Sequence, residues 1–218
     1  MTAVPRVARA SPAECNADRW VHLTGLVLGS AGAATMLSLA ARVTPGVFAA
    51  ALVYSVSLLA MLGCSTLYHH HPTLAYRPSL RRLDHAAIFV LIAGTYTPFT
   101  TCRLHGLWAV GMTLAVWAGA LGGVTLKLVG PVRSGGLSTI AYIALGWVGL
   151  IGMKPILEAV DPHALILVAA GGVIYSIGAG IHRRRSLRFH NAIWHAMVVT
   201  AAACQYTAIL WGVVLAAS

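Results

Sequence analysis

The chain has 218 residues, of which 58% are hydrophobic and only 9% are charged, and its mean hydropathy is +0.79. A soluble domain carries about 25% charged residues, so a chain this poor in charge does not cover a water-facing surface. The composition therefore predicts a multi-pass protein of the cell membrane. The net charge of +10 does not indicate a nucleic-acid partner, because no basic stripe with interleaved aromatic residues accompanies it. Membrane lipids are the expected partners.

Apolar stretches long enough to cross a membrane recur along the chain. A spanning helix needs about 20 mostly apolar residues, and proline, glycine and charged residues mark the breaks between such stretches. Seven stretches meet this requirement: 21–41, 47–68, 84–102, 107–129, 137–157, 164–181 and 191–215. We therefore expect an all-α fold, a bundle of seven transmembrane helices. A cytoplasmic tail at 1–19 would precede a single membrane domain at 20–218.

Basic and small residues predict the orientation and the packing of this bundle. With seven spans, all but three of the fifteen lysines and arginines fall on the side that holds the N-terminus. Cytoplasmic loops carry the excess of basic residues, so the N-terminus is predicted to be cytoplasmic. Glycines four residues apart, at Gly25 and Gly29 and at Gly119 and Gly123, predict close contacts between helices of the same chain.

Polar and ionisable side chains gather at the cytoplasmic end of three predicted spans. Ser65 and His69 are four residues apart, so they share one face near the end of the second span. Asp84 opens the third span, and His195 lies about one turn into the seventh, four residues after Asn191. Ionisable residues in membrane helices are costly and usually functional, so their arrival at one depth predicts a single buried polar site.

The residue types in this site favour a metal. Histidine and aspartate are good zinc ligands, and a catalytic zinc usually has three protein ligands. Each residue also has a structural interpretation: His69 can bind terminal carbonyls, Asp84 can complement a helix dipole, and His195 can pack against a hydroxyl. Spacing alone leaves both interpretations open.

Four segments resemble a known family. They are STLYH at 65–69, RLDHAAI at 82–88, AGTYTPF at 93–99 and NAIWHAMVV at 191–199. In this order they are similar to the bacterial hemolysin III proteins, which resemble the progestin and adipoQ receptors and belong with the alkaline ceramidases. The resemblance covers nearly the whole chain. It implies a seven-helix bundle with its amino terminus inside and a zinc site near the cytoplasmic face.

The resemblance also implies roles for individual residues. The family's Ser-x-x-x-His motif falls on Ser65 and His69, and its aspartate, which is associated with the zinc-bound water, falls on Asp84. Its His-x-x-x-His motif in the seventh helix falls on Asn191 and His195, so an asparagine replaces the first histidine of the pair.

This departure leaves the ligand set open. An amide oxygen is a poor zinc ligand compared with imidazole, and His190 is turned by about 100° from Asn191 on an ideal helix. His190 reaches the site only if the helix start unwinds or carries a bulge, and direct ligation by Asp84 or weak metal binding are further alternatives. The candidate metal ligands are His69, His195, His190 and Asn191, and the candidate catalytic residues are Asp84 and Ser65.

The implied function is a zinc-dependent membrane hydrolase that acts on a lipid amide or ester. The alternative is a non-enzymatic, lipid-responsive or receptor-like membrane protein in which the metal site is structural. A pore-forming cytolysin, which the family name suggests, is disfavoured because the spans carry few polar side chains beyond one cluster. The sequence leaves the lipid and the oligomeric state open.

Overall fold

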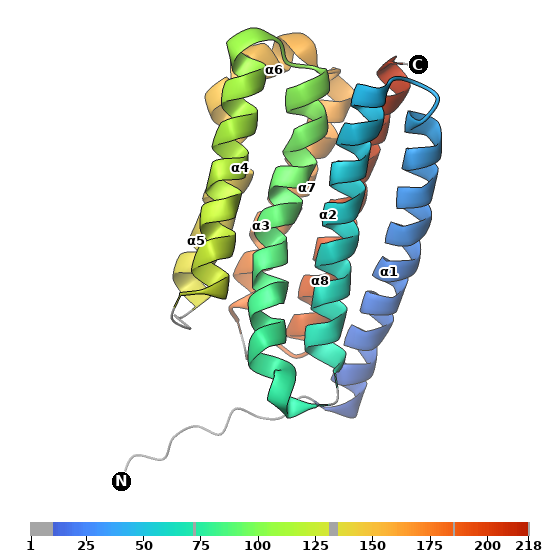
Figure 1. The fold of residues 1–218 in the computed structure, drawn as a ribbon. Helices are drawn as coiled ribbons and strands as arrows, with labels where there is room; N and C mark the ends of the chain where they lie inside the picture. Colours follow the sequence, from blue (N-terminus) through green and yellow to red (C-terminus); the bar gives the residue numbers. More distant parts are fainter. Residues whose placement is uncertain (1–10, 72, 131–134, 185, 218) are drawn as a thin grey trace.

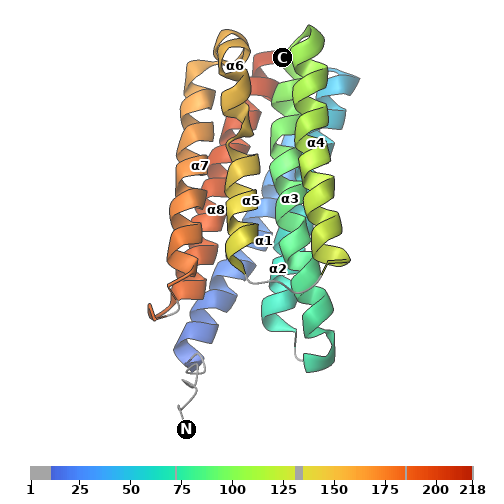
Figure 2. The ribbon, with the colours of Figure 1, turned by 90° about the vertical axis from the view of Figure 1, so that its left-hand side faces the viewer.

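The structure is a computed structural model that describes residues 11–71, 73–130, 135–184 and 186–217. Its long helices stand side by side in one bundle, and α1 begins at the opposite end from the C-terminus (Figures 1 and 2). The helices confirm the predicted all-α fold. Residues 1–10 of the predicted tail, and Arg133 and Arg185 among the basic residues, lie outside the described ranges.

The first helix begins well before the predicted span. α1 is Pro12–Ala40, and its N-cap is Ser11. The Ser11 hydroxyl accepts a hydrogen bond from the Glu14 N–H, and the Glu14 carboxylate accepts one from the Ser11 N–H. This reciprocal capping box, with proline in the first turn, fixes the helix start. Asp18, in the segment predicted to be a tail, therefore lies inside α1.

The next two helices run antiparallel along the middle of the bundle. α2 is Pro45–His70, with the Thr44 hydroxyl accepting from the Val47 N–H, and α3 is Arg77–Cys102. They pack against each other over their length, and α2 also packs on α1 (Figure 1). The end of α2 and the start of α3 consequently lie beside the start of α1.

The fifth predicted span is a broken rod rather than one helix. α4 is Gly106–Leu128. The rod that follows it has three pieces: α5 Gly135–Gly146, η2 Val148–Gly152 and α6 Met153–Ala159. The Tyr96 hydroxyl of α3 fills the break, because it donates to the Gly146 carbonyl at 2.6 Å and accepts from the Gly149 N–H at 3.0 Å. Broken helices in membranes are tolerated where neighbouring side chains satisfy the freed backbone groups in this way.

The last two helices close the bundle against the first. α7 is Pro162–His182, and α8 is His190–Ile209, which continues as a π-helical turn, Leu210–Val214, and a short 3₁₀ turn. α8 packs against both α7 and α1. The start of α8 therefore joins the start of α1 and the end of α2 at one end of the bundle.

Glycines permit these close approaches, as predicted. A Cβ atom on Gly25 would lie 2.9 Å from Val199 of α8, and one on Gly29 would lie 2.5 Å from Leu62 of α2. A Cβ atom on Gly123 of α4 would lie 2.5 Å from the Phe89 ring of α3. The glycine spacing is thus used for packing within the chain.

Six helical segments in the described part of the chain are long and apolar enough to cross a membrane. They are Pro12–Ala40, Pro45–His70, Gly106–Leu128, Leu137–Ala159, Pro162–His182 and His190–Ala217. α3 is 26 residues long, but its threonine-rich second half lowers its hydropathy and it is not among the six. The architecture is that of a multi-pass membrane protein.

Candidate metal centre

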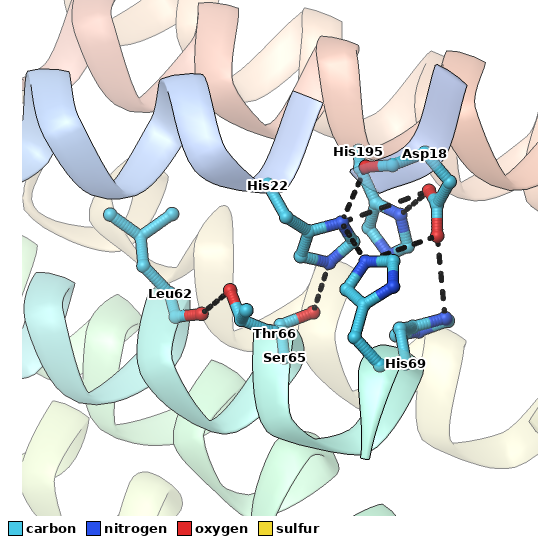
Figure 3. A network of polar contacts seen from close by, with 8 residues as sticks. Asp18, His22, Leu62, Ser65, Thr66, His69 and His195 are labelled. Atoms are coloured by element: carbon cyan, nitrogen blue, oxygen red, sulfur yellow. Dashed lines mark hydrogen bonds and ion pairs between the residues drawn. The ribbon is translucent and has the colours of Figure 1, made fainter. Parts of the chain in front are cut away.

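A buried carboxylate on α1 contacts the predicted histidine on α8. Asp18 is 6% exposed, and its Oδ1 lies 2.6 Å from Nδ1 of His195, which is equally buried (Figure 3). A carboxylate oxygen accepts, so the His195 Nδ1–H donates this charge-assisted hydrogen bond. The capping box that starts α1 at Pro12 is what places Asp18 at this depth.

The other oxygen of the same carboxylate faces the end of α2. Asp18 Oδ2 lies 3.7 Å from Nδ1 of His69 and 3.9 Å from Nε2 of His70. The His69 and His195 rings are 4.5 Å apart, centre to centre. Helices α1, α2 and α8 thus bring four side chains to one point, two of which the sequence had identified.

His22 is fixed by hydrogen bonds in the centre of this cluster. His22 lies one turn after Asp18 on α1, and the His22 Nδ1–H donates to the Asp18 backbone carbonyl at 2.9 Å. Its Nε2 therefore accepts, and the Ser65 hydroxyl donates to it at 3.4 Å (Figure 3). His22 is 5% exposed, and His70 Nε2 lies 3.3 Å from Nδ1 of His22.

The donor chemistry fits a transition metal such as zinc. Two groups of three ligand atoms each lie within 4.8 Å of one another: Asp18, His69 and His195, and Asp18, His22 and His70. Imidazole nitrogens and a carboxylate oxygen are typical zinc ligands. Both ring nitrogens of His22 already have hydrogen-bond partners. Within the described part of the chain, His195 of the first group is hydrogen-bonded through Nδ1 alone, to Asp18 itself, so this group offers the more available ligand atoms.

The predicted catalytic residues lie beside the cluster. Ser65 and Asp84 are buried, on α2 and α3 respectively. Asp84 Oδ2 is 3.3 Å from Nδ1 of His85, and the Asp84 carboxylate also interacts electrostatically with His69 and Ser65. The structure thus gathers Ser65, His69, Asp84 and His195 at one end of the bundle, as the sequence predicts.

The two remaining candidate ligands lie elsewhere at the start of α8. His190 is the first residue of α8, and the centre of its ring lies 6.2 Å from that of His182 on α7. Asn191 follows it, half-buried. Neither residue belongs to the two ligand groups found among the described residues.

Asp18, His22 and His70 are residues of the candidate site that sequence reasoning missed, and the first two were missed for one reason. Hydropathy marks where the chain becomes apolar, near Val21, whereas the helix begins at the cap. The signal was present in the sequence as Ser11 and Glu14 three residues apart around a proline, which predicts a helix start. A helix that starts there carries Asp18 and His22 on one face, one turn apart.

Comparison with known proteins identifies relatives of this chain. The profile of the family described as Haemolysin-III related matches residues 16–206. Hemolysin-3 from Bacillus cereus is 38% identical over 168 residues, which cover 76% of each chain. The Hemolysin-3 homolog from Bacillus subtilis is 35% identical over 159 residues, 73% of this chain and 75% of the relative.

A more distant relative comes from animals. The monocyte to macrophage differentiation factor of Homo sapiens is 28% identical over 171 residues, which cover 73% of this chain and 68% of the relative. No solved structure matches the chain significantly.

Proposed function

This chain belongs to the hemolysin III family of multi-pass membrane proteins, and we propose that it is a zinc-dependent hydrolase that cleaves a lipid amide or ester. The observation that carries the proposal is the meeting of Asp18, His69 and His195 within 4.8 Å. Membrane proteins rarely place a carboxylate and several histidines at one buried point without a functional reason.

We assign the zinc ligands to Asp18, His69 and His195. Asp18 takes the place that the family pattern gives to a histidine at Asn191, because it supplies the third donor from α1 instead of α8. An anionic oxygen is a better zinc ligand than an amide oxygen, so Asp18 compensates for the missing histidine. His22 holds its position through its two hydrogen bonds and orients the cluster.

The residues around this set suit hydrolysis. Zinc bound there supplies Lewis-acid polarisation of a carbonyl and lowers the pKa of a water molecule. Asp84 would provide the carboxylate that accepts a proton from the attacking water, because it interacts electrostatically with His69 and is not one of the ligands. The Ser65 hydroxyl has one O–H, which donates to His22, so Ser65 orients this imidazole beside the ligands and would donate to the reacting carbonyl only after leaving His22.

The depth of the cluster favours a lipid carbonyl as the substrate group. Trp20 lies on α1 between Asp18 and His22, and it is 70% exposed. Exposed tryptophan is enriched at the membrane–water interface, where lipid amide and ester groups also lie. The site is therefore expected at the level of these bonds rather than at the centre of the bilayer.

We also propose α3 as a seventh span, with the N-terminus in the cytoplasm. α3 packs between α2 and α4 and has the length of a spanning helix. The excess of basic residues on the N-terminal side supports this orientation.

A second candidate function is a lipid-responsive, non-enzymatic protein in which the metal is structural. The cluster joins α1, α2 and α8, so a metal there would tie three helices together. In that case zinc removal lowers the melting temperature, and no lipid is hydrolysed in either state.

The test of the hydrolase proposal combines metal content with turnover. Zinc per monomer is measured by elemental analysis in detergent-purified wild type, His69→Ala and His195→Ala, and hydrolysis is followed on a panel of lipid amides and esters. We expect stoichiometric zinc in the wild type, its loss in both variants, and hydrolysis that a chelator abolishes and Zn²⁺ restores. Zinc without turnover would favour the structural role, and hydrolysis that survives loss of zinc would overturn the mechanism.

A further inference from the structure

A second contact between α1 and α8 lies one turn below the candidate ligands. Glu14 Oε1 accepts the backbone N–H of Phe189 at 3.0 Å, and Oε2 accepts the backbone N–H of Ser11 at 2.7 Å. The two donors belong to the residues that immediately precede α1 and α8. One carboxylate therefore joins the first turns of two helices that are far apart in the sequence.

The backbone at Phe189 is held in an unfavourable conformation. Its φ is +60°, in the left-handed region that residues other than glycine rarely adopt. Such a conformation persists only where surrounding contacts stabilise it, and it is commonly found near functional sites. The Glu14 carboxylate supplies a charge-assisted hydrogen bond to the N–H of this residue.

The same two helices make the buried contact of the metal centre. Glu14 and Asp18 are four residues apart on α1 and so share one face. Their partners, Phe189 and His195, are the N-cap and an early residue of α8. Glu14 therefore holds one point of α8 against α1, one turn from the place where Asp18 meets His195.

We propose that Glu14 is a positioning residue for the metal centre: its bond to Phe189 sets the start of α8 so that the Asp18 carboxylate meets His195. Glu14 touches neither ligand, and it acts through Asp18. The inference rests on the proposed function in that it assigns Asp18 and His195 to the zinc site.

NMR resonances of the histidine side chains in metal-free protein test this role. The 2.6 Å hydrogen bond predicts a strongly deshielded Nδ1–H signal for His195, identified by its loss in His195→Ala. We expect Glu14→Ala to abolish the signal. Ser11→Ala removes the capping hydroxyl but leaves both bonds of the Glu14 carboxylate, so the signal should remain. Glu14→Gln keeps one oxygen acceptor without the charge, so the His195 Nδ1–H signal should persist but be less deshielded than in the wild type.

Zn²⁺ affinity, measured against a chelator, supplies the second readout. Glu14→Ala should weaken binding by about 10- to 100-fold, as loss of an orienting partner does. The same change in an Asp18→Asn background should have no additional effect, because Glu14 acts through Asp18. An unchanged His195 signal in both Glu14 variants, or equal losses in Ser11→Ala and Glu14→Ala, would overturn the positioning role. Wild type that binds no Zn²⁺ would refute the proposed function, while the metal-free signal still decides the role of Glu14.

Discussion

The Asp18 carboxylate and the His195 imidazole lie 2.6 Å apart, although 177 positions of sequence separate them. Their contact joins the first and last helices, and α2 adds His69 to the same carboxylate from the other side. The centre therefore depends on the closed arrangement of α1, α2 and α8 rather than on a motif within one helix. Because its members lie on three helices, each can be tested by a separate substitution.

Asp18→Asn distinguishes a ligand from an orienting partner. The amide keeps an oxygen that accepts the His195 Nδ1–H but loses the anionic charge that zinc prefers. If Asp18 is a ligand, Asp18→Asn and Asp18→Ala should both lower zinc affinity beyond the about 10- to 100-fold that is typical of an orienting residue. Chelator competition on purified protein measures this affinity.

Asn16→Ala is the matched control for this pair, because Asn16 is exposed on the same turn of α1. Its zinc affinity should equal that of the wild type. Near-normal affinity in Asp18→Asn, with a large loss only in Asp18→Ala, would reassign Asp18 to orientation of His195.

The start of α8 allows the family pattern to be tested directly. Asn191→Ala and His190→Ala should retain zinc, because neither residue belongs to the ligand groups of the structure. His195→Ala should lose it, since His195 is buried beside Asp18. Elemental analysis of the three variants gives the answer, and zinc loss in Asn191→Ala would restore the asparagine to the ligand set.

Ionisable residues inside or at the ends of the predicted spans can be recognised from sequence, and those outside the spans cannot. His195 lies within a long apolar run and His69 directly follows one, where burial is costly without a role. Asp18 lies in a polar stretch that hydropathy assigns to the solvent, so only the capping signal at Ser11 reveals that it is helical.

The long-range pairings are the part that the sequence does not contain. Nothing local specifies that α1 lies against α8, and the contact follows from the shapes of facing residues such as Gly25 and Val199. The break in the fifth span was missed for a similar reason. Hydropathy stays high across Gly146 and Gly149, and the stabilising hydroxyl comes from Tyr96 on another helix.

Packing between the helices that carry His69 and Asp84 can be tested at one glycine. Gly94 of α3 faces α2, and a Cβ atom there would lie 2.6 Å from Cβ of Ser57 and 3.4 Å from the Val53 carbonyl oxygen. Gly94→Ala should therefore destabilise the protein by about 1–3 kcal/mol, as overpacking of a well-packed interior does. Thermal unfolding in one detergent measures the change.

Gly111→Ala is the control for this substitution, since among the described residues no group outside the backbone of its own helix lies within 4 Å of its Cβ position. It should leave stability unchanged or raise it by about 0.4–1 kcal/mol, because alanine restricts the unfolded chain. Equal melting temperatures for Gly94→Ala and wild type would mean that α2 and α3 separate more easily than the structure indicates.

Two tyrosines of the bundle interior should respond in opposite ways to loss of the hydroxyl. Tyr96→Phe leaves the Gly146 carbonyl and the Gly149 N–H of the broken rod without this partner, which should cost about 1–3 kcal/mol. The Tyr54 hydroxyl is buried and has no hydrogen-bond partner among the described residues, so Tyr54→Phe should be neutral or stabilising. Paired melting curves in the same detergent make the comparison. A large loss in Tyr54→Phe would indicate that a bound water or lipid group satisfies this hydroxyl, and tolerance of Tyr96→Phe would mean that the break in the rod is stabilised by other contacts.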